Sequence, residues 1–424
     1  MSNAFSKEER VAFEQMLEGF QDALVLSRNV SIYNTDSSEM ERSANIIWRP
    51  QPFVAQSFSG TDQTTNFNDS MQLAVPATIG FNRSSPWILS ATELRDSLKE
   101  GRLGDAAKQK LASDINVALM NVAAAQGSLV VKRTTAAGGF DDVAQCEAIM
   151  NEQGVQQFDR YLALGTRDYN GVASDLSKAS RSFDGPKSVK AYERAYVGMV
   201  ASFETYKLDY ANRLQAAAGG GGITMSTLDA AANYYTPKSV SVAATGETAN
   251  VDNRFQTITV SSTTNVVAGD AFTVATLNAV HHITKGDTGQ LKTFRVISVP
   301  SSTTLVITPP MITGQGLTDQ ELSYQNCVIN TKASNSALVW LNTVAAPVNV
   351  FWQKDALEIL PGRYAVPTDA GAAVMKASTD QGIELVLQKQ YDINTMKTKY
   401  RLDTMFGVVN KQPEMSGIML FSQT

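Results

Sequence analysis

Few residues in this 424-residue chain are of the types that carry catalysis or bind metals. The two histidines, His281 and His282, are adjacent in a valine-rich run that predicts a β-strand. Successive residues of a strand point to opposite faces of the sheet, so this pair cannot hold one metal ion together, and we expect one histidine packed and one exposed. Cys146 and Cys327 are far apart and belong to no paired motif, which indicates neither a disulfide framework nor a zinc site.

The charged pairs also favour structural roles. Asp141 and Asp142 stand before an amphipathic segment that runs to Gly154, so we interpret one of them as the start of a helix rather than as part of a catalytic carboxylate pair. Asp252 and Arg254 are two residues apart in VDNRF, and on a strand they would share a face and pair. The sequence predicts no catalytic residue, no cofactor and no metal, and the chain is not expected to be an enzyme.

Composition sets further bounds. A hydrophobic content of 43% is enough to form buried cores, and the length suggests about three domains of roughly 150 residues each. The net charge is −5, with no long run of either sign, whereas a nucleic-acid-binding protein needs a basic surface. Residues 7–10 are charged where a signal peptide would be apolar, and the best apolar run, Ser336–Trp352, is interrupted by Asn342, Pro347 and Asn349. We expect a soluble protein made inside the cell.

The N-terminal segment predicts a helix followed by an arm. Ser6 and Glu9 have the spacing of a capping box, which predicts a helix from Lys7 to about Leu26. Its apolar face would comprise Phe13, Met16, Leu17, Phe20 and Leu24, and its acidic face Glu8, Glu14 and Glu18. The polar residues 31–43 predict an extended arm, and residues 44–49 a short strand that Pro50 and Pro52 end.

Residues 53–81 predict a long hairpin. Two β-like ends, FVAQSF and MQLAVPATIGF, bracket a polar tip in which Phe67 is almost the only apolar side chain. A hairpin with so little to bury is marginal alone and requires a partner surface.

The rest of the chain is organised around one long helix. From Asp105 to Gly127, apolar residues recur at spacings of three and four: Leu103, Ala107, Leu111, Ile115, Leu119 and Val122. We expect Asp105 to cap the start of this helix and Gly127 to end it in the left-handed conformation.

Beyond the long helix, residues 158–218 predict short strands and helices with turns at Asn170-Gly171 and Gly185-Pro186. The run Gly219–Gly222 lacks the Lys-Ser/Thr of a phosphate-binding loop and predicts a flexible joint. After it, alternating runs such as QTITVSS, FRVISV and TTLVIT predict a small β-barrel or sandwich. Residues 338–344 return to helix-like sequence, and residues 400–420 predict two strands with a turn at 411–414.

Five motifs in this order and at this spacing resemble the coat proteins of short-tailed Salmonella-type phages: SANIIWRP, TELRD with NVAAAQGSLV, NVDNRFQTITVS, NVFWQKDALEI and FGVVNKQPE. The resemblance covers nearly the whole length and implies an α+β tailed-phage (Johnson) capsid fold with a spine helix, an E-loop and an all-β insertion. The domains it implies are an N-terminal arm (1–50), the E-loop (51–80), a peripheral P-domain with the spine helix (81–137), an axial A-domain (138–221 and 346–398), an inserted β-barrel (222–345) and C-terminal P-domain strands (399–424).

The resemblance further implies a major capsid protein of the virion, assembled in the bacterial cytoplasm into hexamers and pentamers of an icosahedral shell around double-stranded DNA. The implied partners are other copies of the chain, a portal protein at one vertex and, because no extra domain precedes the arm, a separate scaffolding protein. Candidate assembly residues are Glu8, Glu14, Glu18, Phe67, Asp252 and Arg254.

Two departures from related shells qualify this expectation. No lysine occurs between Lys7 and Lys99, which excludes the isopeptide cross-link that an E-loop lysine makes in some shells, and the loop SVAATGET lacks an acidic run associated with intersubunit contacts. The competing interpretation is a soluble enzyme or binding protein with a β-sandwich module. A shell subunit buries a long polar hairpin and arm against its neighbours, whereas a monomer has no use for them.

Overall fold

The computed structural model describes residues 5, 7–33, 46–55, 57–64, 66–67, 70–93, 97–179, 194–195, 197–208, 212–219, 222–226, 235–330, 335–366 and 371–424. The chain forms two compact units. The first comprises Met1–Ile47, Pro76–Asn121 and Glu358–Val409, and the second comprises Trp48–Val75, Val122–Leu357 and Asn410–Thr424. Both units are therefore assembled from segments far apart in the sequence.

The first unit is built on a six-stranded sheet in the order β1-β21-β24-β23-β22, with β4 paired to β24. Its strands are β1 (Ser31–Ile32), β4 (Phe81–Ser90), β21 (Leu357–Pro361), β22 (Ala373–Ser378), β23 (Glu384–Asp392) and β24 (Lys397–Asn410). The long antiparallel pair β4 and β24 is reinforced by stacked rings, Phe81 on Phe406 at 5.3 Å and Trp87 on Tyr400 at 5.5 Å between centroids. Cross-strand aromatic pairs of this kind stabilise a long ladder.

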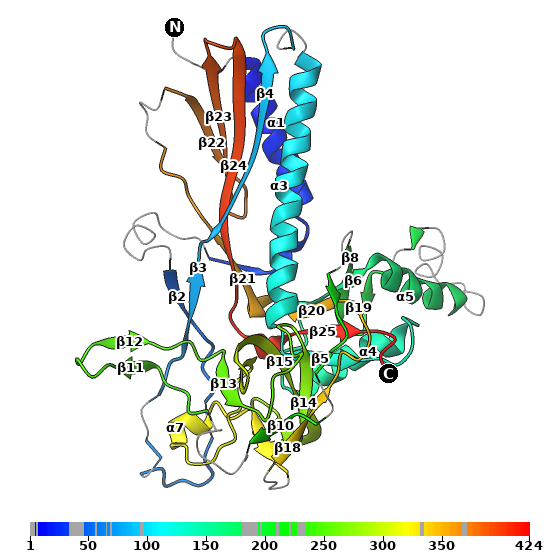
Figure 1. Ribbon diagram of the computed structural model, residues 1–424, viewed down its shortest axis with the longest axis vertical. Helices are drawn as coiled ribbons and strands as arrows, with labels where there is room; N and C mark the ends of the chain where they lie inside the picture. Colours follow the sequence, from blue (N-terminus) through cyan, green and yellow to red (C-terminus); the bar gives the residue numbers. More distant parts are fainter. Residues whose placement is uncertain are drawn as a thin grey trace. The chain divides into compact units, whose positions relative to one another are not determined.

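Two helices accompany this sheet, α1 (Lys7–Ala23) and α3 (Ser97–Gln126) (Figure 1). The predicted first helix is confirmed, with Phe13, Phe20 and Leu24 buried, and the 3-10 turn η1 (Leu26–Asn29) follows it. Along α3 the predicted apolar face is buried at Ala107, Leu111, Ile115 and Leu119. These are the positions that the three-and-four spacing selected.

The predicted start of the long helix is wrong, whereas its predicted end is confirmed. The helix begins at Ser97, eight residues before Asp105, and includes Gly104, where a Cβ would lie 2.7 Å from Met16 Sδ of α1. It ends at Gln126, but Gly127 does not adopt the predicted positive φ. The lack of a side chain at Gly127 is required instead because a Cβ would lie 2.8 Å from the Ala123 carbonyl oxygen and 3.0 Å from the Gly417 nitrogen, a close approach of backbones.

The second unit holds a mixed sheet in the order β5-β25-β20-β6-β8-β7. Its strands are β5 (Leu129–Lys132), β6 (Arg160–Gly165), β7 (Met199–Val200), β8 (Phe203–Leu208), β20 (Asn349–Gln353) and β25 (Ser416–Leu420). Helices α4 (Phe140–Glu152) and α5 (Thr166–Ala179) pack on it over a core that includes Val143, Cys146, Leu162, Phe203 and Phe351. The predicted turn at Asn170-Gly171 is wrong, since both residues lie within α5, and Gly185-Pro186 lies outside the described residues.

The same unit contains the predicted barrel. A seven-stranded sheet runs β10-β18-β14-β15-β16-β13, with β17 paired to β14. Its strands are β10 (Thr224–Ser226), β13 (Gln256–Thr259), β14 (Ala271–Val280), β15 (Asp287–Ser301), β16 (Thr304–Thr308), β17 (Cys327–Ile329) and β18 (Asn335–Trp340). A bridge between Met225 and Val260, and a hydrogen bond of 2.8 Å from Ser261 N to Thr224 O, join the two ends, so the sheet closes on itself.

Strand β18 corrects the helix-like interpretation of residues 338–344. Leu338 is buried in the barrel core, and Val339 pairs with Thr273 of β14. Within the glycine run, a Cβ at Gly219 would lie 2.8 Å from the Trp340 ring, while Gly220 and Gly221 lie outside the described residues, so the flexible joint stays a prediction. A short apolar run does not distinguish a buried strand from a helix segment, which is why the periodicity misled here.

The E-loop is paired only at its base. Strand β2 (Ile46–Pro50) pairs with β3 (Ala74–Thr78), and Gln51 N donates to Leu73 O at 2.9 Å. Among the described residues between 51 and 73 there is no strand, so the β-like end FVAQSF was wrongly interpreted. Most of the predicted arm, residues 34–45, lies outside the described residues.

Two short strand pairings and a short helix are also present. Strand β11 (Val240–Val242) pairs with β12 (Thr248–Asn250), β9 (Arg213–Leu214) pairs with β19 (Ala346–Pro347), and the short helix α7 (Asp319–Leu322) precedes β17. The predicted C-terminal strands and turn are confirmed as β24, the 3-10 turn η5 (Pro413–Met415) and β25. Among the described residues, no helix is both long and apolar enough to cross a membrane.

Candidate assembly site

The residues that can carry chemistry do not gather into a reactive centre. Within the described part of the chain, no group of three or more His, Cys, Asp or Glu side chains is placed to hold a metal ion. Cys146 and Cys327 are both buried, and burial raises the pKa of the Cys327 thiol to about 12 and that of Cys146 further. Both thiols therefore stay protonated at neutral pH and are not nucleophiles.

The acidic pair is explained by helix capping. Asp142 is buried at the start of α4, where its Oδ2 accepts from Gly138 N at 2.7 Å and from Gly139 N at 3.3 Å. Its Oδ1 accepts from Arg133 Nε at 2.6 Å. The helix-start interpretation of Asp141-Asp142 is confirmed, but neither residue is the N-cap: the helix begins at Phe140 after the N-cap Gly139, and Asp142 is the third helical residue, whose carboxylate reaches back to the N-cap N–H.

Asp252 and Arg254 pair, but not on a strand. They lie in the turn before β13, where Arg254 Nη2 is 2.7 Å from Asp252 Oδ2 and Arg254 Nε is 2.9 Å from Asp252 Oδ1. Arg254 Nη1 also donates to Asn410 O at 3.0 Å, which ties the barrel to the end of β24. This bidentate pair fixes a corner within one chain, and any part it has in assembly stays a prediction.

The two histidines also differ from the prediction. Strand β14 ends at Val280, so both residues lie in the following turn and both are half-buried. His281 Nδ1 accepts from Thr284 N at 3.1 Å, which closes the turn. The backbone N–H of His282 donates to Gln153 O at 3.0 Å, and its side chain lines a cavity.

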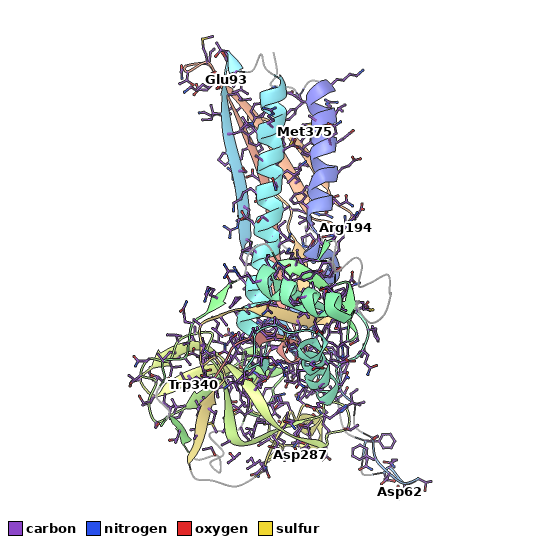
Figure 2. All side chains as sticks on the ribbon, turned by 90° about the vertical axis from the view of Figure 1, so that its right-hand side faces the viewer. Asp62, Glu93, Arg194, Asp287, Trp340 and Met375 are labelled. Atoms are coloured by element: carbon purple, nitrogen blue, oxygen red, sulfur yellow. The ribbon has the colours of Figure 1, made fainter. Side chains whose placement is uncertain are left out.

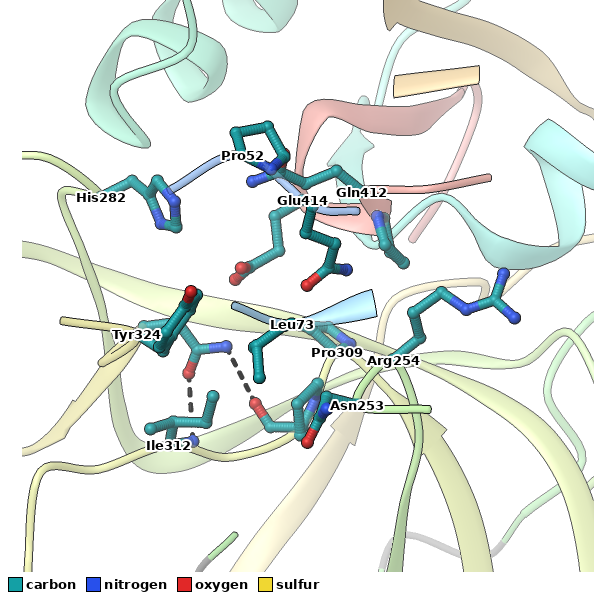
Figure 3. Close-up of a pocket in the computed structure, with 14 residues that line it drawn as sticks. Pro52, Leu73, Asn253, Arg254, His282, Pro309, Ile312, Tyr324, Gln412 and Glu414 are labelled. Carbon is teal, nitrogen blue, oxygen red and sulfur yellow. Dashed lines mark hydrogen bonds between the residues drawn. The ribbon is translucent and has the colours of Figure 1, made fainter. Parts of the chain in front are cut away.

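That cavity, of about 50 Å³, lies where three distant segments meet (Figure 3). The E-loop base contributes Gln51, Pro52 and Leu73, the turn around η5 contributes Gln412, Pro413 and Glu414, and the barrel contributes residues that include Asn253, Arg254 and His282. In Figure 3, Glu414 and His282 face the same space as Gln412. We call this meeting point the joint.

An ion pair that is largely removed from solvent crosses the joint. Lys292 Nζ of β15 lies 2.5 Å from Glu414 Oε1 and donates to Gln153 Oε1 at 2.9 Å. The Lys292 side chain is 1% exposed, and that of Glu414 is 18% exposed. Burial alone would raise the pKa of Glu414, but the charges of Lys292, His282 and Lys285 outweigh burial and lower it.

Two further polar side chains of β15, those of Thr293 and Arg295, donate to backbone carbonyl groups. Thr293 Oγ1 donates to Ser128 O at 2.7 Å, and the buried Arg295 donates through Nε to Gly269 O at 3.1 Å. Arg295 Nη1 lies 3.5 Å from Gly127 O, beside the end of α3, where a cation is favourable to the helix dipole. Hydrogen bonds and charges therefore contribute to the attachment of the barrel.

The outward side of α1 carries acidic groups. Glu14 and Glu18 are exposed, while Glu9 turns inward and its Oε1 lies 2.5 Å from Lys389 Nζ. Glu8 belongs to the helix, but its side chain lies outside the description. The exposed acidic surface of α1 is thus Glu14 and Glu18 among the residues described.

The E-loop exposes large apolar side chains. Phe67 is 87% exposed, Phe53 58% and Phe58 45%. At the base, Tyr324 Oη of the barrel donates to Met71 O at 2.6 Å, and Leu73, Ile312 and Tyr324 form a small cluster. In Figure 2, Asp62 marks the E-loop where it projects from the rest of the second unit. The loop is anchored at its base, and Phe53 and Phe58 line a hollow beside α7, whereas Phe67 is largely in solvent.

A sequence-family model described as “P22 coat protein - gene protein 5” matches residues 1–422. The chain belongs to this coat-protein family. It is a family of structural capsid proteins rather than of enzymes, so the protein is a phage capsid protein of the virion. The α+β tailed-phage capsid fold expected from the five motifs is confirmed.

Several solved structures are similar to the chain. A chain of Mycobacterium phage Che8 shares 8% identity with a TM-score of 0.44, over 94% of this chain and 92% of that one. The capsid of cyanophage P-SCSP1u shares 11% identity with a TM-score of 0.43, over 93% and 87%. The CUS-3 coat protein I-domain shares 34% identity with a TM-score of 0.22, over 30% of this chain and 99% of that domain.

The joint is the feature that sequence reasoning missed. Lys292, Glu414 and Gln153 are separated by more than a hundred positions from one another, and no local pattern links them. One signal was present: in LKTFRV of β15, a lysine and an arginine occur within a run that is buried on both faces. A charge in a strand buried on both sides needs a partner, which indicates a polar contact surface.

Proposed function

We propose that this capsid protein is the major capsid protein that self-assembles into the hexamers and pentamers of an icosahedral phage head. The observation that carries the proposal is the exposed aromatic set of the E-loop, Phe53, Phe58 and Phe67. Full burial of one phenylalanine stabilises by about 1.5–3 kcal/mol, so these side chains are a source of contact energy that the isolated subunit leaves unused. A neighbouring copy of the chain is the partner that would bury them.

We propose that assembly also uses a scaffolding protein, and that the acidic surface of α1 contacts a basic segment of it. Glu14 and Glu18 are exposed, whereas the apolar side of the same helix is packed within its own chain. The helix thus has a free charged face without being free to detach. Reversing Glu8, Glu14 and Glu18 to lysine should abolish co-purification of the scaffolding protein while leaving the fold intact; unchanged co-purification would eliminate this contact.

Two further partners are proposed, a portal protein and double-stranded DNA. A closed head requires one vertex with a portal protein for DNA entry, and the enclosed double-stranded DNA would be held without sequence-specific binding. A net charge of −5 without a basic run suits a shell that encloses DNA without sequence-specific binding.

The domain division is proposed as it follows from the family resemblance. It assigns residues 1–50 to the arm, 51–80 to the E-loop, 81–137 and 399–424 to the P-domain, 138–221 and 346–398 to the A-domain, and 222–345 to the inserted barrel. The closed sheet from β10 to β18 supports the last assignment.

Electron microscopy of the purified protein, produced with and without its scaffolding protein, tests the proposal. We expect closed shells of uniform size with the scaffold and irregular particles without it. A protein that stays monomeric under both conditions would contradict the capsid assignment and favour a soluble binding protein.

A further inference from the structure

We propose that the joint is an acid-released latch, in which protonation of His282 loosens the attachment of the inserted barrel to the rest of the second unit. The proposal concerns the described residues of one chain and does not depend on how shells assemble. It rests on the composition of the contact, on the position of His282 in it, and on the balance of charge around that side chain.

Polar contacts cross the joint beside the small apolar cluster of Leu73, Ile312 and Tyr324. Lys292 binds Glu414 and Gln153, Thr293 binds the Ser128 carbonyl, and the His282 backbone binds the Gln153 carbonyl. Buried charged contacts add little net stability while every group is paired, and they become strongly unfavourable when one charge is added or removed. The polar part of the attachment can therefore be weakened by a single proton, whereas the apolar cluster cannot.

The charge balance around His282 makes protonation unfavourable in the closed joint. Among the described residues, Glu414 on η5 favours the charged form of His282, while Lys292 on β15 and Lys285 and His281 in its own turn oppose a further positive charge. Burial, together with these positive charges, lowers the pKa of His282 to about 4 against the opposing effect of Glu414. Burial is also the main cause that lowers the pKa of Lys285 to about 8; Lys292 lowers it further, and Glu414 opposes the shift.

The direction of the pH effect follows from comparing His282 in the closed joint with His282 in the open joint. In the open joint His282 is in water, with an ordinary pKa of about 6.5, so the open state binds the proton more tightly than the closed state. Acidification from pH 6.5 towards pH 4 therefore favours opening. With pKa values of about 6.5 and 4, lowering the pH from 7.5 to 5 increases the open-to-closed ratio by about 30-fold.

The chain offers a matched control because it contains only these two histidines. His281→Gln keeps a hydrogen-bond acceptor at the turn and leaves His282 in place. His282→Gln removes the titrating group from the cavity while keeping a polar side chain of similar size.

Hydrogen exchange on the full-length protein at pH 7.5 and 5, corrected for the intrinsic rate, measures opening through the amides of residues 280–296 and 410–416. We expect exchange there to increase by about 30-fold on acidification in the native protein and in His281→Gln, and by less than about 3-fold in His282→Gln. No increase in the native protein, or an equal increase in His282→Gln, would overturn the proposal.

A second measurement covers the case in which His282→Gln fails to fold. The carbon-13 chemical shift of the two labelled histidine rings in the native protein reports each pKa directly, and His281→Gln identifies which signal belongs to His282. A His282 pKa of 6.5 or above would also overturn the latch.

Discussion

The E-loop and the inserted barrel lie in the same unit, yet their phenylalanine side chains differ in burial. In the barrel, Phe272 and Phe294 stack at 5.6 Å and are completely buried. In the E-loop, Phe67 is 87% exposed. The barrel therefore carries its stabilising contacts within the chain, whereas Phe67 of the E-loop contributes little within the chain and, under the proposed function, would be buried by another copy.

The joint differs from both the barrel core and the exposed E-loop. Its central groups are buried but charged, so it neither adds an apolar core nor stays open to water. A buried ion pair gives little net stability compared with an apolar contact, but it is strongly destabilised when one partner is lost. The comparison teaches that folding of the barrel and its attachment can be altered separately.

The largest effect is expected from shortening the E-loop. Replacing residues 59–70 by a two-residue turn should leave the melting temperature of the subunit within about 2 °C, because few contacts within the chain are lost. It should also prevent closed shells entirely, as judged by electron microscopy. If the shortened protein still formed uniform shells, the loop would not be an assembly element; if it unfolded, the loop would belong to the core of the subunit.

Phenylalanine in the two regions provides a direct comparison. Phe272→Ala should lower the free energy of unfolding by about 3–5 kcal/mol because it leaves a cavity in a closed core. Phe67→Ala should change it by less than about 0.5 kcal/mol, since the ring is in water. Urea denaturation of both variants measures this difference, and equal losses would remove the contrast between the regions.

Removing one charge of the Lys292–Glu414 pair should lower the free energy of unfolding more than removing both. Lys292→Met leaves Glu414 and Gln153 without their donor, and we expect a loss of about 2–3 kcal/mol. The double variant Lys292→Met, Glu414→Leu should recover most of this loss, because no unpaired charge remains. Denaturation of the single and double variants tests the pairing; a double variant no better than the single one would contradict it.

The isolated barrel should retain its fold with a modest loss of stability. A fragment of residues 222–345 keeps the closed sheet and its core, and it loses only the polar contacts of the joint. We expect a β-type circular dichroism spectrum and a cooperative melt. A random-coil spectrum would mean that the barrel depends on its attachment.

Subunits of mature particles are not expected to be covalently cross-linked, and hot detergent would show this. The E-loop has no lysine, so mature particles should dissolve to a single monomer band on a denaturing gel. A ladder of covalent oligomers would refute this expectation.

The elements that local pattern decides were predictable. The apolar spacing located α1 and most of α3, the alternating runs located β13, β15 and β16, and the acidic pair Asp141-Asp142 located the first turn of α4. In each case one stretch of chain contains its own reason for the structure, and the five motifs were sufficient to indicate the family.

Contacts between distant segments decided the remainder. Gly104 lies inside α3 with Met16 against it, Gly171 lies inside α5 with Ala137 against it, and residues 338–340 are a strand because β14 provides a partner. The joint depends on Lys292 and Glu414, which are 122 positions apart. The sequence alone determined which segments can bury an apolar face, because that property is local; the tertiary structure decided which buried charges meet, because their partners come from elsewhere in the chain.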